Sequence, residues 1–181
     1  MSSSKKAIAA VEAPETRPGD VIERGLERWR ISRPDIDSSA KGIVGRIIRL
    51  QDFILQEVNE ALAPCRLRYH EYAVIATLRV APAPHQMSPR ELLQSLLFTS
   101  GGLSLLISRL EQAGHVERLR DPRDGRGVIV RLTPEGKRLA DEAMPVHAAA
   151  EHRLIAMLDA DEKAAMARSL RAMLEPHERQ P

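Results

Sequence analysis

Residues 99–136 read TSGGLSLLISRLEQAGHVERLRDPRDGRGVIVRLTPEG, and this stretch decides the fold. Its first half has apolar residues at three- and four-residue steps up to Leu110, which indicates a helix, and Gly114 supplies a left-handed terminator. Apolar residues then alternate with charged ones in residues 115–120 and 128–132, as expected for a hairpin with the tip DPRDGRG. A helix that leads directly into a hairpin predicts a wing.

A shorter helix is predicted just before this stretch, in MSPRELLQSLL at residues 87–97. Ser88 suits the N-cap, Pro89 the first helical position, and Glu91 completes a capping box. The tight FTS turn joins this helix to the next one, so the pair is a predicted helix-turn-helix. A helix-turn-helix followed by a hairpin is a winged helix.

The rest of the chain is predicted to be helical apart from its start. Amphipathic or apolar patterns indicate helices over residues 19–29, 39–62 and 70–80, a helix from Thr133 and Pro134 toward residue 159, and a last helix capped by Asp159 and Glu162. We therefore expect a mainly α fold: a winged helix-turn-helix with N- and C-terminal dimerisation helices and a two-stranded β wing. The expected divisions are a disordered arm (1–18), N-terminal helices for dimerisation and a pocket wall (19–64), a DNA-binding lobe (65–136) and C-terminal dimerisation helices (137–176).

Composition excludes several classes of function. The net charge is only +2, so nucleic-acid binding would need a local basic patch. A single cysteine, Cys65, precludes an internal disulfide, and the six histidines lack metal-ligand spacing, so we expect neither a metal nor a cofactor. The sequence shows no nucleophile elbow, phosphate-binding loop or dinucleotide pattern, so we do not expect an enzyme. No apolar run suggests a membrane span or signal peptide, so a cytoplasmic protein is expected.

Three motifs occur in one order and spacing: SPRELL, TSGGLSLLISRLEQAGHVER and DPRDGRGVIVRLTPEGKRL. Together they resemble the MarR family of bacterial transcription regulators over about residues 40–175. The resemblance implies a homodimer that reads a pseudo-palindromic operator in double-stranded DNA and responds to a small molecule. The apolar stripes of the first and last helices agree with a dimer, because one subunit has too little core to cover them.

A narrower likeness lies in RWRISRPDIDSS, residues 28–39. A Trp followed by this turn resembles the PecS and urate-responsive branch of the family, which has four ligand-associated positions. Trp29 and Arg118 match two of them, whereas Ala73 and Leu106 replace the branch's Asp and Arg. We therefore expect a small aromatic or phenolic acid as effector, with urate or another purine as the alternative.

The hairpin is a candidate for minor-groove contact. Five arginines and two aspartates between residues 118 and 131 give a local charge of +3, and a narrow minor groove attracts arginines. Arg126 matches the family's groove-inserting arginine, Asp124 could hold a guanidinium in place, and Arg123 is a second candidate. The alternative is a solvated turn with local ion pairs, each worth at most about 1 kcal/mol.

The helix-turn-helix supplies the remaining candidate DNA contacts. Small and hydroxyl-bearing residues at the start of a helix allow close approach to phosphates and base edges. Leu105 could meet a thymine methyl or pack against the neighbouring helix, and Ser88 could contact a phosphate or serve only as a cap. The full set is Ser88, Arg90, Thr99, Ser100, Gly101, Gly102, Ser104, Leu105, Ser108 and Arg109.

The candidate effector residues are Trp29, His70, Tyr72, Ala73 and Arg118. Each has a plainer alternative: Trp29 could fasten its helix to the core, Arg118 could brace the wing, and His70 could be a packing residue. Cys65 raises a redox-sensing alternative, but the sensing cysteines of relatives lie near the start of the long helix and Cys65 lies past its end. The sequence therefore predicts a ligand-responsive, homodimeric repressor; the alternative from another class is a winged helix that contacts only proteins.

Overall fold

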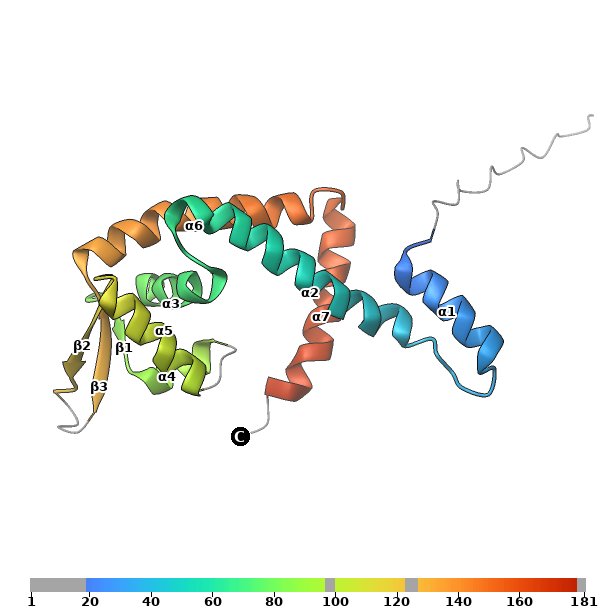
Figure 1. Cartoon of the computed structure of the whole chain (residues 1–181), viewed down its shortest axis with the longest axis horizontal. Helices are drawn as coiled ribbons and strands as arrows, with labels where there is room; N and C mark the ends of the chain where they lie inside the picture. Colours follow the sequence, from blue (N-terminus) through green and yellow to red (C-terminus); the bar gives the residue numbers. More distant parts are fainter. Residues whose placement is uncertain (1–18, 97–99, 123–126, 179–181) are drawn as a thin grey trace, which may run out of the picture. The chain divides into compact units, whose positions relative to one another are not determined.

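A computed structural model describes residues 19–96, 100–122 and 127–178. The chain divides into two compact units, residues 1–52 and 53–181, which are described separately. Both are built mainly from helices, and the order of the elements along the chain is shown in Figure 1. The finer division expected from the sequence, into an arm, two sets of dimerisation helices and a DNA-binding lobe, stays a prediction.

The first unit consists of α1 (Val21–Ser32) and the first half of α2 (Lys41–Leu62). Asp20 caps α1 by accepting a hydrogen bond from Glu23 N at 2.8 Å, and it also binds Arg46 of α2 at 2.7 Å. A Cβ at Gly45 would lie 3.2 Å from Ile22 Cδ1, so the absence of a side chain allows the two helices to approach closely. The two helices are thus joined by an ion pair at one point and by close packing at another.

The second unit places a helical core beside a small sheet. After a short 3-10 turn (Ala63–Cys65) come α3 (Tyr69–Val80), α4 (Pro89–Ser95) and α5 (Ser100–Gln112), and after the sheet come α6 (Pro134–Leu154) and α7 (Ala160–Glu178). Helix α3 packs against α4, α5 and α6. The most deeply buried side chains come from the end of α2, from α3, α4 and α5 and from the sheet: Leu62, Ile75, Leu78, Leu92, Leu103, Ile107, Val116 and Val130.

The sheet contains the predicted hairpin and one strand that the sequence did not predict. Strands β2 (Val116–Arg120) and β3 (Val128–Leu132) are antiparallel, with Arg118 opposite Val130. The additional strand β1 (Gln86–Met87) pairs with the other side of β3, so the order is β1-β3-β2. Sequence patterns marked residues 81–86 only as a helix break, because a two-residue strand is too short to show alternation.

Close contacts between the end of α5 and the start of α6 fix the base of the hairpin. Gly114 has φ +77°, so the predicted left-handed terminator of α5 is confirmed. Thr133 Oγ1 donates to Gly114 O at 2.7 Å and accepts from Gly136 N at 3.0 Å, so one hydroxyl links the end of α5 to the start of α6. A Cβ at Gly136 would lie 1.9 Å from the carbonyl oxygen of His115, so only glycine fits in this first turn of α6.

Several helix boundaries differ from the predicted ones: α1, α2 and α3 begin one or two residues from the expected positions, and the larger differences are at helix ends. Helix α1 continues to Ser32 instead of residue 29, because Pro34 is the first residue that cannot continue it and Arg33 still forms the C-cap. Helix α4 has seven residues instead of about ten. Helix α6 ends at Leu154, and the predicted caps Asp159 and Glu162 then open α7 by reciprocal hydrogen bonds of 2.9 Å.

Helix α7 buries none of its described side chains and leaves four apolar residues about half exposed: Met166, Leu170, Met173 and Leu174. In the described ranges no single helix is long and apolar enough to span a membrane. Helices α4 and α5 reach the necessary length and apolar content only when they are taken together, and the chain bends sharply between them.

Candidate nucleic-acid interface and effector pocket

Helices α4 and α5 have the arrangement of a helix-turn-helix. Their axes are bent by 113°, within the range of about 90–120° typical of the motif. Ser88 caps α4 as predicted: Glu91 N donates to its hydroxyl at 3.2 Å, and its own backbone N–H donates to the Glu91 carboxylate at 2.7 Å. The capping role of Ser88 is therefore present, and contact of Ser88 or of exposed Arg90 with a phosphate stays a prediction.

The first two turns of α5 expose the predicted DNA-reading face. Ser100, Gly101, Gly102 and Ser104 are exposed, and Thr99 lies outside the described residues. Leu105 is 55% exposed, so it is available to a thymine methyl and does not pack into the helix pair. Further along the helix, Arg109 is exposed, whereas the Ser108 hydroxyl accepts a hydrogen bond from Arg118.

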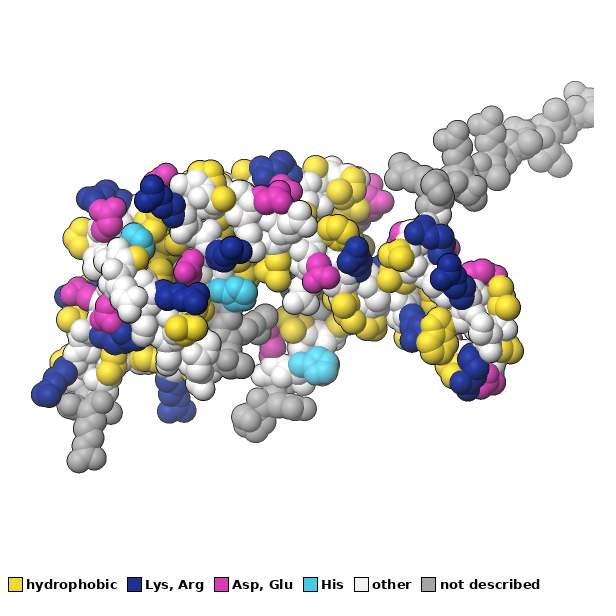
Figure 2. Space-filling model, viewed as in Figure 1, with side chains coloured by type: hydrophobic (Ala, Val, Ile, Leu, Met, Phe, Trp, Pro, Cys, Tyr) yellow, Lys and Arg dark blue, Asp and Glu magenta, His cyan; other side chains and the backbone are white. Residues whose placement is uncertain are grey.

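The hairpin continues away from the helices and ends at a tip that lies outside the described residues (Figure 1). The three tip candidates, Arg123, Asp124 and Arg126, belong to this tip, so their contacts stay predictions. Below the tip, Arg131 donates to its cross-strand partner Glu117 at 2.9 Å. Lys and Arg side chains (dark blue) lie near the wing in Figure 2.

Arg118 is held by α5. Its guanidinium pairs with the Glu111 carboxylate, and its Nη2 donates to Ser108 Oγ at 2.9 Å. Its backbone N–H also donates to Glu111 Oε1 at 3.2 Å. These contacts are the ones that the bracing alternative for Arg118 requires, and its predicted contact with an effector would have to compete with Glu111.

The other effector candidates of the second unit surround an aromatic stack. Tyr72 is 8% exposed and stacks on His147 of α6 with ring centroids 4.3 Å apart. Burial, with Glu151 and Tyr69 nearby, raises the pKa of Tyr72, so its phenol stays protonated at neutral pH. His70 is exposed, and its ring and that of Tyr69 form a T-shaped pair with centroids 5.6 Å apart.

The two positions that depart from the urate-responsive branch carry no charge. Leu106 is half-buried against the core, and Ala73 is half-buried on α3. A charged pair like that of the branch is therefore absent at these two described positions, and their contribution is apolar contact.

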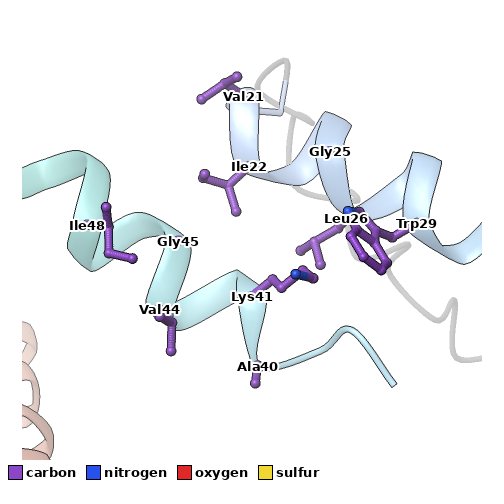
Figure 3. A pocket seen from close by; sticks show the side chains of 10 residues that line it. All are labelled: Val21, Ile22, Gly25, Leu26, Trp29, Ala40, Lys41, Val44, Gly45 and Ile48. Atoms are coloured by element: carbon purple, nitrogen blue, oxygen red, sulfur yellow. The ribbon is translucent and has the colours of Figure 1, made fainter. Parts of the chain in front are cut away.

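Trp29 lies in an apolar pocket of about 500 Å³ formed by α1 and the start of α2 (Figure 3). Trp29 is 39% exposed, and Lys41 Nζ lies 4.2 Å from the ring centroid, within range of a cation–π interaction. The remaining lining is aliphatic or small: Val21, Ile22, Gly25, Leu26, Ala40, Val44, Gly45 and Ile48. This pocket has a size typical of small-molecule sites, with one ammonium group at an otherwise apolar wall.

Cys65 lacks the surroundings of a reactive thiol. It is 9% exposed, and burial together with Glu142 raises its pKa, which disfavours the thiolate at neutral pH. Metal-binding groups of three or more His, Cys, Asp or Glu are absent from the described ranges. Neither observation favours a redox or metal-dependent switch.

Comparison with known proteins agrees with this geometry. A model described as MarR family matches residues 67–127, which cover the helix-turn-helix and strand β2 and end just before β3. The multiple antibiotic resistance protein MarR of Escherichia coli (strain K12) is 32% identical over 136 residues, which are 72% of this chain and 90% of that protein. The chain belongs to the MarR family of transcriptional regulators. Members of the family are regulators and not enzymes, in agreement with the sequence prediction.

Other similar proteins include a regulator matched over more of this chain and a MarR structure that contains operator DNA. The HTH-type transcriptional regulator PecS of Dickeya dadantii (strain 3937) is 29% identical over 152 residues, 84% of this chain and 91% of that protein. A structure of a mutant E. coli MarR complexed with operator DNA has a TM-score of 0.68 at 30% identity, and covers 77% of this chain and 99% of that one. The fold predicted from the sequence is confirmed.

Two residues of the site were missed by sequence analysis. Lys41 meets Trp29 only because the turn after α1 reverses the chain, so no periodic pattern links the two. Glu111 stands seven residues before Arg118 across the Gly114 turn, and a carboxylate at that spacing from a strand arginine was a signal that could have been used.

Proposed function

We propose that the protein is a homodimeric repressor that binds a pseudo-palindromic operator in double-stranded DNA and is released by a small aromatic or phenolic acid. The observation that carries DNA binding is the exposed first half of α5 beside a basic hairpin, in a fold that its E. coli relative uses in complex with operator DNA. The recognition helix would enter the major groove and the wing the adjacent minor groove. We expect the protein to act in the cytoplasm, where its DNA target lies.

The dimer is supported by apolar residues that one chain leaves exposed. On α2, Ile43, Ile48 and Phe53 are 51–62% exposed, and α7 carries the half-exposed stripe described above. A homodimer formed by the first and last helices would cover these surfaces and provide two copies of the recognition helix.

The effector class is supported by the pocket at Trp29. An indole face suits stacking on a planar ring, and the aliphatic lining suits an apolar ligand body. The ammonium of Lys41, which lies over the Trp29 ring, would attract a carboxylate or phenolate. Arg118 belongs to the second unit and is paired with Glu111, so the support for an effector pocket comes from Trp29 and Lys41.

Urate or another purine is the alternative effector, supported by the matching Trp29 and Arg118 and by the relationship to PecS. The apolar lining of the pocket and the uncharged Ala73 and Leu106 disfavour it, because buried polar edges of a purine would lack partners.

The test follows the fluorescence of the only tryptophan, Trp29, during titration with hydroxybenzoates, phenylpropanoid acids and urate, with anisotropy of a labelled duplex from the gene's own upstream region read in parallel. We expect quenching and duplex release by an aromatic acid, with weaker binding of that acid by Lys41→Gln.

Arg24→Gln is the matched control, because it also removes a cation from this unit but Arg24 does not line the pocket. Quenching and release by urate alone would favour the purine alternative. Quenching without release would reject the pocket as the switch.

A further inference from the structure

Arg118 connects the two elements that are proposed to read DNA. It stands in β2, whereas its partners Glu111 and Ser108 stand in the last turns of α5. Ser108 and Glu111 are three residues apart, so they share one face of the helix, and this face is turned toward the strand. We call this group of three side chains the wing clasp.

The clasp uses both the backbone and the side chain of the strand. Strand β2 is an edge strand, because β3 lies between it and β1. The Arg118 N–H points away from β3 and donates to Glu111 Oε1 at 3.2 Å, while the guanidinium binds the same carboxylate and Ser108 Oγ. One carboxylate therefore holds the main chain and the side chain of β2 against α5, which restricts how the strand can rotate about the turn at Gly114.

The charge of Arg118 is also neutralised within the clasp. The Arg118 and Glu111 side chains are 33% and 38% exposed, so both are partly withdrawn from solvent. An arginine already paired with a carboxylate is a weak candidate for a phosphate contact. Its neighbour Arg120 is exposed on the same strand.

We propose that Arg118 is a positioning residue that contacts neither phosphate nor base, and that the wing clasp fixes the angle between the wing and the recognition helix. This inference rests on the proposed function, since it assumes that both elements engage one operator. Loss of the clasp lets the wing move relative to α5, so that the two elements no longer fit their grooves together.

The clasp predicts that loss of the negative charge of Glu111 weakens DNA binding, which is the opposite of what simple charge attraction predicts. Removal of a negative charge beside a DNA-binding surface would strengthen binding if long-range attraction decided the outcome. Glu111→Gln should instead weaken binding to the upstream duplex by about five- to tenfold, the loss expected for a partly exposed charge-assisted hydrogen bond. Arg118→Lys should weaken binding nearly as much as Arg118→Gln, because an ammonium lacks the fork that reaches two partners.

The experiment is a fluorescence-anisotropy titration of the full chain with the upstream duplex over a series of salt concentrations. A positioning role predicts weaker binding of Glu111→Gln and Arg118→Gln with an unchanged slope of log affinity against log salt, and a double variant no weaker than either single one. The control is Glu117→Gln, which also removes a carboxylate paired with a wing arginine, but one whose partner Arg131 lies on β3; it should bind within about twofold of the parent. Thermal unfolding checks that each variant is folded. If Arg118→Gln does not fold, the milder Arg118→Lys takes its place in the titration.

Three outcomes would overturn the inference. A slope reduced by about one in Arg118→Gln would make Arg118 a phosphate contact. Unchanged or tighter binding by Glu111→Gln would remove the clasp from the mechanism while leaving the proposed repressor intact. If the parent protein showed no preference for the upstream duplex over a scrambled one, the proposed function and the clasp would both fail.

Discussion

Single residues decide which contacts the winged helix can make. Leu105 is exposed on the recognition helix, whereas Leu106 beside it is half-buried against the core, so neighbouring leucines have different roles. Ser88 is fully engaged as a cap by Glu91. Arg118 is held by Glu111, which leaves the tip arginines as the main candidates for the minor groove.

The first residue-scale prediction concerns the wing tip. Arg126→Ala should weaken binding to the upstream duplex by about 1–3 kcal/mol and lower the salt slope by about one, because it removes a groove-inserting guanidinium. Arg123→Ala should cost less. Anisotropy titrations at several salt concentrations give both quantities. Binding by Arg126→Ala that equals the parent's would show that the tip stays outside the groove.

The second residue-scale prediction concerns His115 at the base of the wing. Its Nδ1 is buried without a hydrogen-bond partner in the described part of the chain, and burial lowers its pKa below the usual 6.5, with Glu71 partly offsetting this effect. The unfolded chain therefore binds a proton near pH 6.5, whereas His115 in the folded chain stays neutral to lower pH. The free energy of unfolding should fall as the pH drops below about 7, and this group should leave it unchanged at higher pH. Urea unfolding at about pH 7.5 and 5.5 measures this loss. His115→Gln should lose less over the same interval, and an identical loss would assign the pH dependence to other groups.

Elements could be predicted where their signals are local. The capping box of α4, the terminator at Gly114 and the alternation of β2 and β3 follow from short sequence patterns, and the structure has all three. Strand β1 exists only because β3 offers it a partner, and the pairing of Lys41 with Trp29 depends on a chain reversal, so neither has a local signature. Contacts made by packing across the fold are the part that sequence patterns did not contain.

The element-scale prediction concerns the junction of α5, β2 and α6. Gly136→Ala should lower the free energy of unfolding by at least about 2 kcal/mol, because the new Cβ would overlap the His115 carbonyl and the backbone would have to shift. Gly101→Ala is the matched control: its Cβ would meet nothing within 4 Å, and alanine favours a helix by about 0.5–1 kcal/mol over glycine. Urea unfolding compares the two variants. Equal stability of both would show that the first turn of α6 can move away from His115 at little cost.

The proposed recognition of a pseudo-palindromic operator requires two copies of the whole molecule. The exposed apolar residues of α2 and α7 are more than a single chain covers, and a pseudo-palindrome needs two recognition helices. Leu170→Glu combined with Met173→Glu should shift the protein from dimer to monomer and weaken duplex binding, because charges would replace apolar contacts on α7. Sedimentation analysis over a dilution series measures the shift, with exposed Arg171→Glu as the control for added charge on the same helix. A parent protein that sediments as a single chain of 20.1 kDa at micromolar concentration would contradict the dimer.

The decisive measurement for operator recognition is the affinity of the parent protein for the duplex from its own upstream region, measured by anisotropy against a scrambled duplex of equal length and composition. A repressor of this kind should bind the upstream duplex with two chains per site and at least about a thousandfold more tightly than the scrambled one, with affinity that falls steeply as salt rises. Equal affinity for the two duplexes at physiological salt would contradict specific operator binding by this protein.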